Sequence, residues 1–175
     1  KYFKGFIELF SRSEKIAEAE YLYSMSLYKV SPNSNLDQSS TLEAISAIQN
    51  FINKYPYSDY SKNANAIIDE LQIKLETKNF ENAKQYYKTR NYKSAIIALE
   101  NFANDFPDSS FNEEGSYLKI LSQYLISINS FEDLQEERFK ETIQLYLNFI
   151  DKYPKSSFQP QAEEMYVESL NLLTK

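Results

Sequence analysis

The chain has 175 residues, a net charge of -6 and 42% hydrophobic residues, which suits one domain or one segment of a repeat protein. It contains no Cys and no His, which excludes disulfides and the commonest zinc sites and removes the two side chains most used as nucleophile and general base. Its acidic balance, without a run of Lys or Arg, argues against nucleic-acid binding, and its 2 Gly and 5 Pro favour helices over a fold with many turns.

The first predicted elements are the end of a helix, at residues 1–10, and a second helix whose apolar stripe is formed by Ile16, Ala19, Leu22, Tyr23 and Leu27. A long polar connection, residues 31–40, follows, and Thr41 is a candidate N-cap for the helix after it. Asp37 and Gln38 have the chemistry of a turn. Because this connection departs from the repeat described below, Asp37 is a candidate for a family-specific contact.

The third predicted helix carries its apolar stripe on Ile45, Ile48, Ile52 and Tyr55. Pro56 is expected to stop this helix, because the residue before a proline is pushed out of the α region. Ser58 stands two residues later, at a good N-cap position for the next helix. Tyr60 can then cover the turn.

The span from Tyr60 to Arg90 contains no Gly or Pro. Its apolar stripe predicts either one long helix or two helices with a kink near Lys78 and Asn79. We expect the helix to end at Asn91, which can adopt the left-handed conformation that glycine usually fills. The stripe consists of Ala64, Ile67, Ile68, Leu71 and Leu75, and continues through Phe80, Ala83, Tyr86 and Tyr87.

The second half of the chain repeats this order. One helix ends at Pro107 and carries Ile96, Leu99, Ala103 and Phe106, and the next carries Tyr117, Leu118, Leu121, Leu125 and Ile128. A polar connection over residues 127–137 leads to a helix that ends at Pro154. A terminal helix with Ala162, Met165, Tyr166, Ser169 and Leu170 closes the chain.

An eleven-residue phrase, N-F-x-[ND]-x-[YF]-P-x-S-x-[YF], accounts for this order, since it occurs at 50–60, 101–111 and 148–158. A weaker copy lies at 6–13, with Ser11 in place of the proline. The shared phenylalanines Phe6, Phe51, Phe102 and Phe149 are 45, 51 and 47 residues apart. This period predicts an all-α fold, a right-handed α-solenoid of tetratricopeptide-like helix pairs, in which residues 1–175 form a single segment with an incomplete N-terminal repeat.

Repeats without catalytic residues usually indicate a binding scaffold, so we expect no enzyme activity, no cofactor and no metal. Tyrosines on the first helix of each pair either fill the layers between helices or hold an extended peptide in a groove. Lys84, Lys88, Arg90 and Lys93 converge near one turn, either as a solvated helix end or as a site for an acidic partner. The predicted partner-binding residues are Tyr21, Tyr28, Asp37, Tyr86, Tyr87, Arg90 and Lys93, and Tyr117 and Tyr124 are further groove candidates.

The phrase F-x-x-x-Y-P-x-S-x-Y followed by a helix resembles the divergent tetratricopeptide repeat of bacterial cell-envelope proteins. Two longer stretches, from Ser31 to Pro56 and from Phe80 to Phe102, narrow this resemblance to the BamD family of outer-membrane assembly lipoproteins, in its Bacteroidetes-like form. The resemblance covers nearly all of the chain.

The resemblance implies a periplasmic scaffold that a lipid on an N-terminal Cys tethers to the inner leaflet of the outer membrane. It would hold the POTRA domains of BamA, and other subunits of the assembly machinery, and help to insert unfolded β-barrel proteins. By position, the turn from Arg90 to Lys93 with its following helix, and the last repeats, would face BamA. The region around Tyr21 to Asp37, and the missing first repeat, would face substrate. We expect the signal peptide, the lipidated Cys and about one and a half repeats to lie upstream of Lys1.

Two other readings stay open at this point. Periplasmic scaffolds of the CpoB type, which coordinate envelope constriction and peptidoglycan synthesis, share the repeat phrase but usually have short, regular turns with glycine. An envelope hydrolase would instead use a carboxylate pair such as Glu113 or Glu114 with another acid, in a deep pocket.

Overall fold

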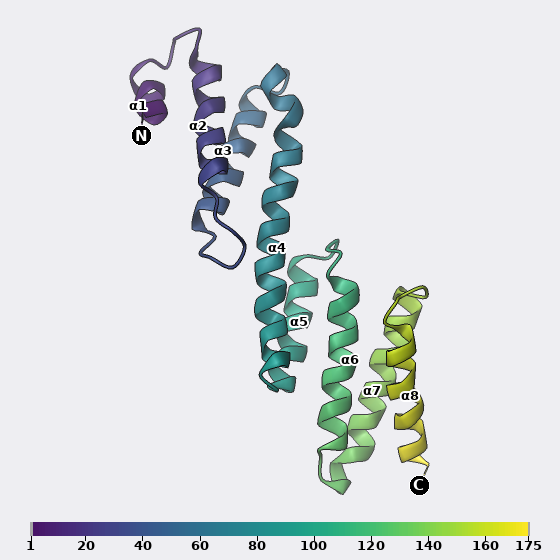
Figure 1. Cartoon of the computed structure of the whole chain (residues 1–175). Helices are drawn as coiled ribbons and strands as arrows, with labels where there is room; N and C mark the ends of the chain where they lie inside the picture. The colour runs from purple at the N-terminus through teal and green to yellow at the C-terminus, as the bar shows by residue number, and fades with distance from the viewer. Residues whose placement is uncertain (1, 175) are drawn as a thin grey trace. The chain divides into compact units, whose positions relative to one another are not determined.

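The computed structural model describes residues 2–174 and contains, within that range, eight α-helices, one short 3-10 helix and no strand (Figure 1). The all-α prediction is therefore confirmed, and the handedness of the solenoid stays a prediction. The helices are α1 (Tyr2–Leu9), α2 (Ile16–Val30), α3 (Ser39–Lys54), α4 (Ala64–Lys88), α5 (Tyr92–Asp105), α6 (Asn112–Ile128), α7 (Glu132–Lys152) and α8 (Gln159–Leu173), with the 3-10 turn at Asp59–Asn63.

The chain divides into two compact units, whose boundary falls between Lys78 and Asn79. This boundary lies inside α4, which runs without a break from Ala64 to Lys88. Of the two alternatives for this span, the single long helix is correct. No loop separates the units, and the prediction of one continuous solenoid segment stays a prediction.

The core of unit 1 lies between α3 and α4. It contains Ala44 and Ile48 from α3 and Ala64, Ile68 and Leu71 from α4, all nearly inaccessible to solvent. Leu27 and Tyr28 from the end of α2 pack against this cluster. The helices α1, α2 and α3 also contact one another in sequence. The stripes predicted for α3 and α4 therefore face this core, as their period of 3.6 residues requires, whereas Leu22 of the stripe predicted for α2 is exposed.

Unit 2 has two consecutive cores, because α6 packs on α5 at one side and on α7 and α8 at the other. Its first core is formed by Phe80, Ala83, Leu99, Phe102 and Leu118, and its second by Ile120, Tyr146, Phe149, Ala162 and Met165. Opposite faces of α6 thus serve different layers. Such nearest-neighbour stacking is the organisation expected of helical repeats.

The turn encoded by the repeated phrase has the same hydrogen bonds in all four copies. Its second aromatic donates its backbone N–H to the carbonyl of the phenylalanine four residues earlier, as Tyr55 does to Phe51 (2.9 Å) and Phe10 does to Phe6 (2.9 Å). The two rings are 5.2 Å apart in both copies. Since the copy with Ser11 makes this turn without proline, the aromatic pair and the serine that follows are its common elements.

The serine of the phrase accepts a hydrogen bond from the backbone N–H two residues later in every copy. The distances are 3.2 Å at Ser13, 3.3 Å at Ser58 and Ser109, and 3.1 Å at Ser156. Ser58 is the N-cap of the 3-10 turn. For α6 and α8 the predicted cap is wrong by two residues, because Phe111 and Phe158 are their N-caps and the serines stabilise the preceding turn.

Two further local predictions are wrong. Thr41 is not an N-cap: α3 begins at Ser39, and the buried Thr41 hydroxyl donates to Gln38 Oε1 at 2.7 Å. The left-handed residue after α4 is Arg90 (φ 62°), whereas Asn91 has φ -86°. Propensity favours Asn in the left-handed conformation. However, α4 ends at Lys88, so the left-handed position after it falls on Arg90 and not on Asn91.

Candidate functional site

The predicted partner-binding residues form two groups, one in each unit. Tyr21, Tyr28 and Asp37 belong to unit 1, where they lie on α2 and on the connection from α2 to α3. Tyr86, Tyr87, Arg90 and Lys93 belong to unit 2, where they surround the turn from α4 to α5. The structure clusters the residues of the unit 2 group around one turn, whereas in unit 1 Tyr21 packs near the start of α4 and Asp37 lies near Lys78, further along that helix.

Tyr21 and Tyr28 have specific partners within unit 1. The ring of Tyr21 stacks on Tyr60 at 4.6 Å and also contacts Phe51. The hydroxyl of Tyr28 donates to Glu70 Oε2 at 2.6 Å. This hydrogen bond, with burial and the nearby negative charge, raises the pKa of Tyr28. Packing between helices accounts for Tyr21, while Tyr28 ties α2 to α4.

The connection over residues 31–38 is held against α4. Lys78 Nζ donates to the carbonyl of Leu36, and Lys74 Nζ lies 3.4 Å from Ser31 Oγ. Inside the connection, Gln38 Nε2 donates to the carbonyls of residues 33 and 36. The connection is therefore an ordered surface feature despite its polar composition.

Asp37 stays exposed at the end of this connection. Its carboxylate accepts the backbone N–H of Ser39 at 3.0 Å. Hydrogen bonds from Ser39 hold the pKa of Asp37 below its ordinary value, and the charge of Lys78 contributes in the same direction. Asp37 is thus an oriented, ionised acceptor at the surface of unit 1.

The turn from α4 to α5 is a Schellman motif. The N–H of Asn91 donates to the carbonyl of Tyr86 at 2.8 Å, and the N–H of Arg90 donates to the carbonyl of Tyr87 at 2.9 Å. Both bonds satisfy carbonyls at the end of α4, and the left-handed residue between them is required by this motif. The backbone of Arg90 is therefore fixed.

The four basic residues near this turn have different roles. Lys84 pairs with Glu114, and Lys88 pairs with Glu81 at 2.9 Å. Arg90 and Lys93 are exposed, and within residues 2–174 no carboxylate lies within ion-pair distance of either. Tyr86 is also exposed, whereas Tyr87 packs against the first core of unit 2. The surface of the turn is therefore cationic, with one accessible aromatic ring.

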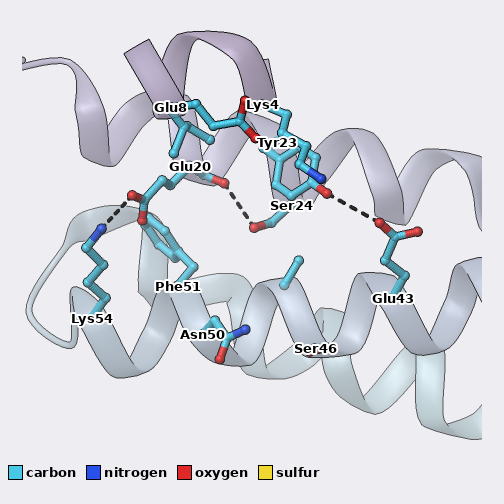
Figure 2. A pocket seen from close by; sticks show the side chains of 12 residues that line it. Lys4, Glu8, Glu20, Tyr23, Ser24, Glu43, Ser46, Asn50, Phe51 and Lys54 are labelled. Carbon is cyan, nitrogen blue, oxygen red and sulfur yellow. Dashed lines mark hydrogen bonds and ion pairs between the residues drawn. The ribbon is translucent and has the colours of Figure 1, made fainter. Parts of the chain in front are cut away.

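One groove of unit 1 was not predicted from the sequence. It has a volume of about 570 Å³ and is formed by α1, α2 and α3 (Figure 2). Glu20 pairs with Lys54 at 2.6 Å at one end, and Tyr23 donates to Glu43 Oε1 at 3.3 Å at the other. The remaining lining residues are Lys4, Ile7, Glu8, Ser24, Ser46, Ala47, Asn50 and Phe51.

This groove could not be predicted from the sequence, because three separate helices form its walls. In the sequence, the polar residues of these helices are indistinguishable from those of an ordinary solvent-exposed face. Of its lining residues, the sequence had singled out Tyr23, as part of an apolar stripe, and Phe51, as the phenylalanine of the repeated phrase. The walls carry both charges and several hydrogen-bonding groups, while apolar atoms make up most of the surface that lines the groove. None of the helices within residues 2–174 is long and apolar enough to span a membrane.

Comparison with known proteins decides the family. The YfiO family, described as outer membrane lipoprotein, matches residues 1–86 and again residues 74–175. The chain belongs to this family. The two matches overlap in α4, where the boundary between the units lies.

A curated relative of this family agrees with that assignment. The chain is 27% identical over 157 residues to the outer membrane protein assembly factor BamD of Rickettsia prowazekii (strain Madrid E). The matched region covers 90% of this chain and 59% of the relative, so the chain spans less than two thirds of that protein's length. The resemblance to the BamD family is confirmed, and the CpoB-type alternative is not favoured. The partner-binding residues stay predictions.

Proposed function

We propose that this chain is a non-catalytic scaffold of the outer-membrane β-barrel assembly machinery that docks the POTRA domains of BamA. The family assignment and the name of the Rickettsia relative support a role in outer-membrane assembly. The observation that supports this docking surface is the turn at Arg90. Its fixed backbone presents two cations, Arg90 and Lys93, that pair with no carboxylate among residues 2–174.

The chemistry of this turn suits an acidic partner surface. Lys84 and Lys88 are engaged with carboxylates of the same unit, so Arg90 and Lys93 provide the uncompensated positive charge. Tyr86, with 46% of its surface exposed, offers an amphipathic ring beside them. Because the Schellman motif fixes the turn before binding, little backbone entropy is lost on association.

We infer that unit 1 contributes the surface for unfolded β-barrel polypeptides. The groove between α1, α2 and α3 is open and has carboxylates, amides and hydroxyls along its walls (Figure 2). Such groups can accept and donate the backbone hydrogen bonds of an extended chain. The ordered connection that ends at Asp37 lies in the same unit.

The location that we propose is the periplasmic face of the outer membrane. The family description, outer membrane lipoprotein, supports tethering to the inner leaflet of that membrane by a lipid. The helices described here would then act outside the bilayer and position a partner domain relative to it.

The docking surface is tested by titrating this chain with the purified POTRA domains of BamA from the same organism, at low and at high salt. We expect saturable binding that weakens about tenfold or more when Arg90→Glu and Lys93→Glu are combined, with the loss largest at low salt. The control is Arg12→Glu combined with Lys29→Glu, the same double charge reversal at exposed positions of unit 1. Absence of binding by the folded chain, or equal losses for both sites, would contradict the proposal.

A further inference from the structure

A second feature of unit 2, the turn from α6 to α7, exposes an aromatic side chain that the core does not need. Phe131 leaves 83% of its surface accessible, and Ile128 and Leu134 on either side leave 38% and 37%. Ile128 is the last residue of α6, Phe131 lies in the turn, and Leu134 lies in the first turn of α7. An exposed Phe at a helix junction adds nothing to the burial that stabilises unit 2.

The backbone around Phe131 is held by several hydrogen bonds. The N–H of Ser130 donates to Ser127 (3.2 Å), and the carbonyl of Ser130 accepts from Gln135 Nε2 (3.0 Å). The Ser130 hydroxyl also bonds to Ile126 and Arg138. Asn129 Nδ2 donates to the carbonyl of Leu125 at 2.7 Å, which closes the end of α6. Phe131 is therefore presented from a rigid turn rather than from a mobile loop.

Acidic side chains surround this aromatic residue. Glu132, Asp133 and Glu137 are exposed, and no cation among residues 2–174 pairs with them. The one paired carboxylate is Glu136, bound to Lys140 at 2.5 Å. Arg138 does not neutralise these exposed carboxylates, because its guanidinium donates a hydrogen bond to the Ser130 hydroxyl within the turn. Glu132 and Asp133 also suit the N-terminus of α7, but this role does not explain the exposed ring.

The turn at Phe131 lies at the same end of the helices of unit 2 as the turn at Arg90 (Figure 1). This follows from the chain order, since α5 reverses α4 and α6 reverses α5, so the C-terminal ends of α4 and α6 point the same way. One end of unit 2 therefore carries a cationic turn and, on the next helix pair, an aromatic turn with an acidic border.

We propose that Phe131 is a docking residue for the same partner domain, inserting into an apolar cleft whose rim carries Lys or Arg. The identity of the partner rests on the proposed function, whereas the chemistry of the cleft rests on the aromatic ring and its acidic border. Rigid aromatic residues that lose their exposed surface on binding are the usual energetic centres of interfaces. The negative border disfavours the alternative of an anionic lipid surface.

The two turns together would fix the orientation of the partner domain on unit 2. A partner that meets a cationic turn and an acidic, aromatic turn on one end of unit 2 can bind in only one direction, because the reversed pose places like charges opposite each other.

The test is a titration of the POTRA domains of BamA with the whole 175-residue chain and its variants. Phe131→Ala is expected to weaken binding about tenfold or more. Glu132→Lys with Asp133→Lys is expected to weaken binding at low salt, with a smaller difference at high salt. Tyr57→Ala is the matched control, because Tyr57 is a fully exposed aromatic residue in a turn of unit 1.

The outcomes separate this inference from the proposed function. If the wild-type chain binds and Arg90→Glu weakens binding while Phe131→Ala does not, the proposed function holds and this inference is overturned. If the folded wild-type chain does not bind, both are overturned. Circular dichroism of each variant distinguishes lost contacts from lost folding, and an unchanged melting temperature is expected for Phe131→Ala because its side chain is exposed.

Discussion

The ring of Phe111 stacks on the ring of Phe80 with centroids 4.9 Å apart and planes 12° apart. Tyr117 and Phe158 repeat this relationship at 4.8 Å and 12°. In both cases the last aromatic residue of the repeated phrase packs against the first helix of the preceding helix pair, which is α4 for Phe111 and α6 for Phe158. The sequence had predicted only that this residue covers its own turn. These contacts tie consecutive helix pairs within unit 2.

Phe111→Ala should therefore destabilise unit 2 more than removal of an exposed aromatic. We expect a loss of about 2 to 3 kcal/mol in the free energy of unfolding, below the range for a fully buried Phe because the ring is half-buried. Urea denaturation followed by circular dichroism measures this change. Tyr57→Ala is the control, since Tyr57 is fully exposed and should change stability little. Equal effects of the two substitutions would show that the stack does not stabilise the fold.

Arg90→Gly should stabilise the chain, because Arg90 has φ 62° and glycine adopts this conformation without a steric penalty. The expected gain is roughly 0.5 to 1 kcal/mol, after allowing for the greater unfolded-state entropy of glycine. Thermal unfolding would detect it as a higher melting temperature. Asn91→Gly, at φ -86°, should give no gain, and a gain from Asn91→Gly rather than Arg90→Gly would contradict the assignment of the left-handed residue.

Ser122→Ala and Ser127→Ala should have opposite effects, although both serines are fully buried on α6. The hydroxyl of Ser122 has no hydrogen-bond partner among the described residues. Replacing it with Ala removes an unsatisfied polar group, which should leave stability unchanged or raise it by up to about 1 kcal/mol.

Ser127 donates to the carbonyl of Gln123 at 2.8 Å and lies 3.2 Å from Thr142 Oγ1. Its removal should cost about 1 kcal/mol. Chemical denaturation of the two variants beside the wild type makes the comparison. A loss at Ser122 as large as that at Ser127 would mean that the Ser122 hydroxyl is satisfied in solution.

Tyr124 should ionise only at unusually high pH. Burial first, and then its hydrogen bond to Glu168 and the charge of that residue, raise the pKa of Tyr124 to about 12 from an ordinary value of 10.0. Because the folded state favours the neutral phenol, this contribution to stability is complete below pH 10 and is lost as the pH rises towards 12. The titration of phenolate absorbance, as the difference between wild type and Tyr124→Phe, isolates this group.

Glu168→Gln provides the matching variant, since it removes the negative charge and should lower the pKa of Tyr124. A difference titration centred near the ordinary tyrosine value in the wild type would show that the phenol is exposed and not bound to Glu168.

Most helix positions could be predicted from the sequence, because a helix depends on the local spacing of apolar residues and on turn residues nearby. The stripes that include Ile48, Leu71 and Leu99 all face cores, and the phrase around Phe102 ends its helix where expected. The fourth copy at Phe6 was also recognisable without proline. The error at Thr41 is a shift of three residues from the N-cap at Gln38, and the error at Asn91 is a shift of one residue from Arg90. Neighbouring residues at a helix end can often fill the same capping role, so the sequence does not fix which one does.

The sequence by itself determined the helical class, the repeat and the family resemblance, because these are properties of residue order over tens of residues. Tertiary structure alone decided which side chains are available for binding. It paired Lys84 and Lys88 with glutamates, while Arg90 and Lys93 have no carboxylate partner in the part of the chain that the structure describes. It also packed Tyr21 against Tyr60 and assembled the groove of unit 1 from three helices. Availability depends on what lies opposite each helix face, and residues far apart in the chain supply those partners.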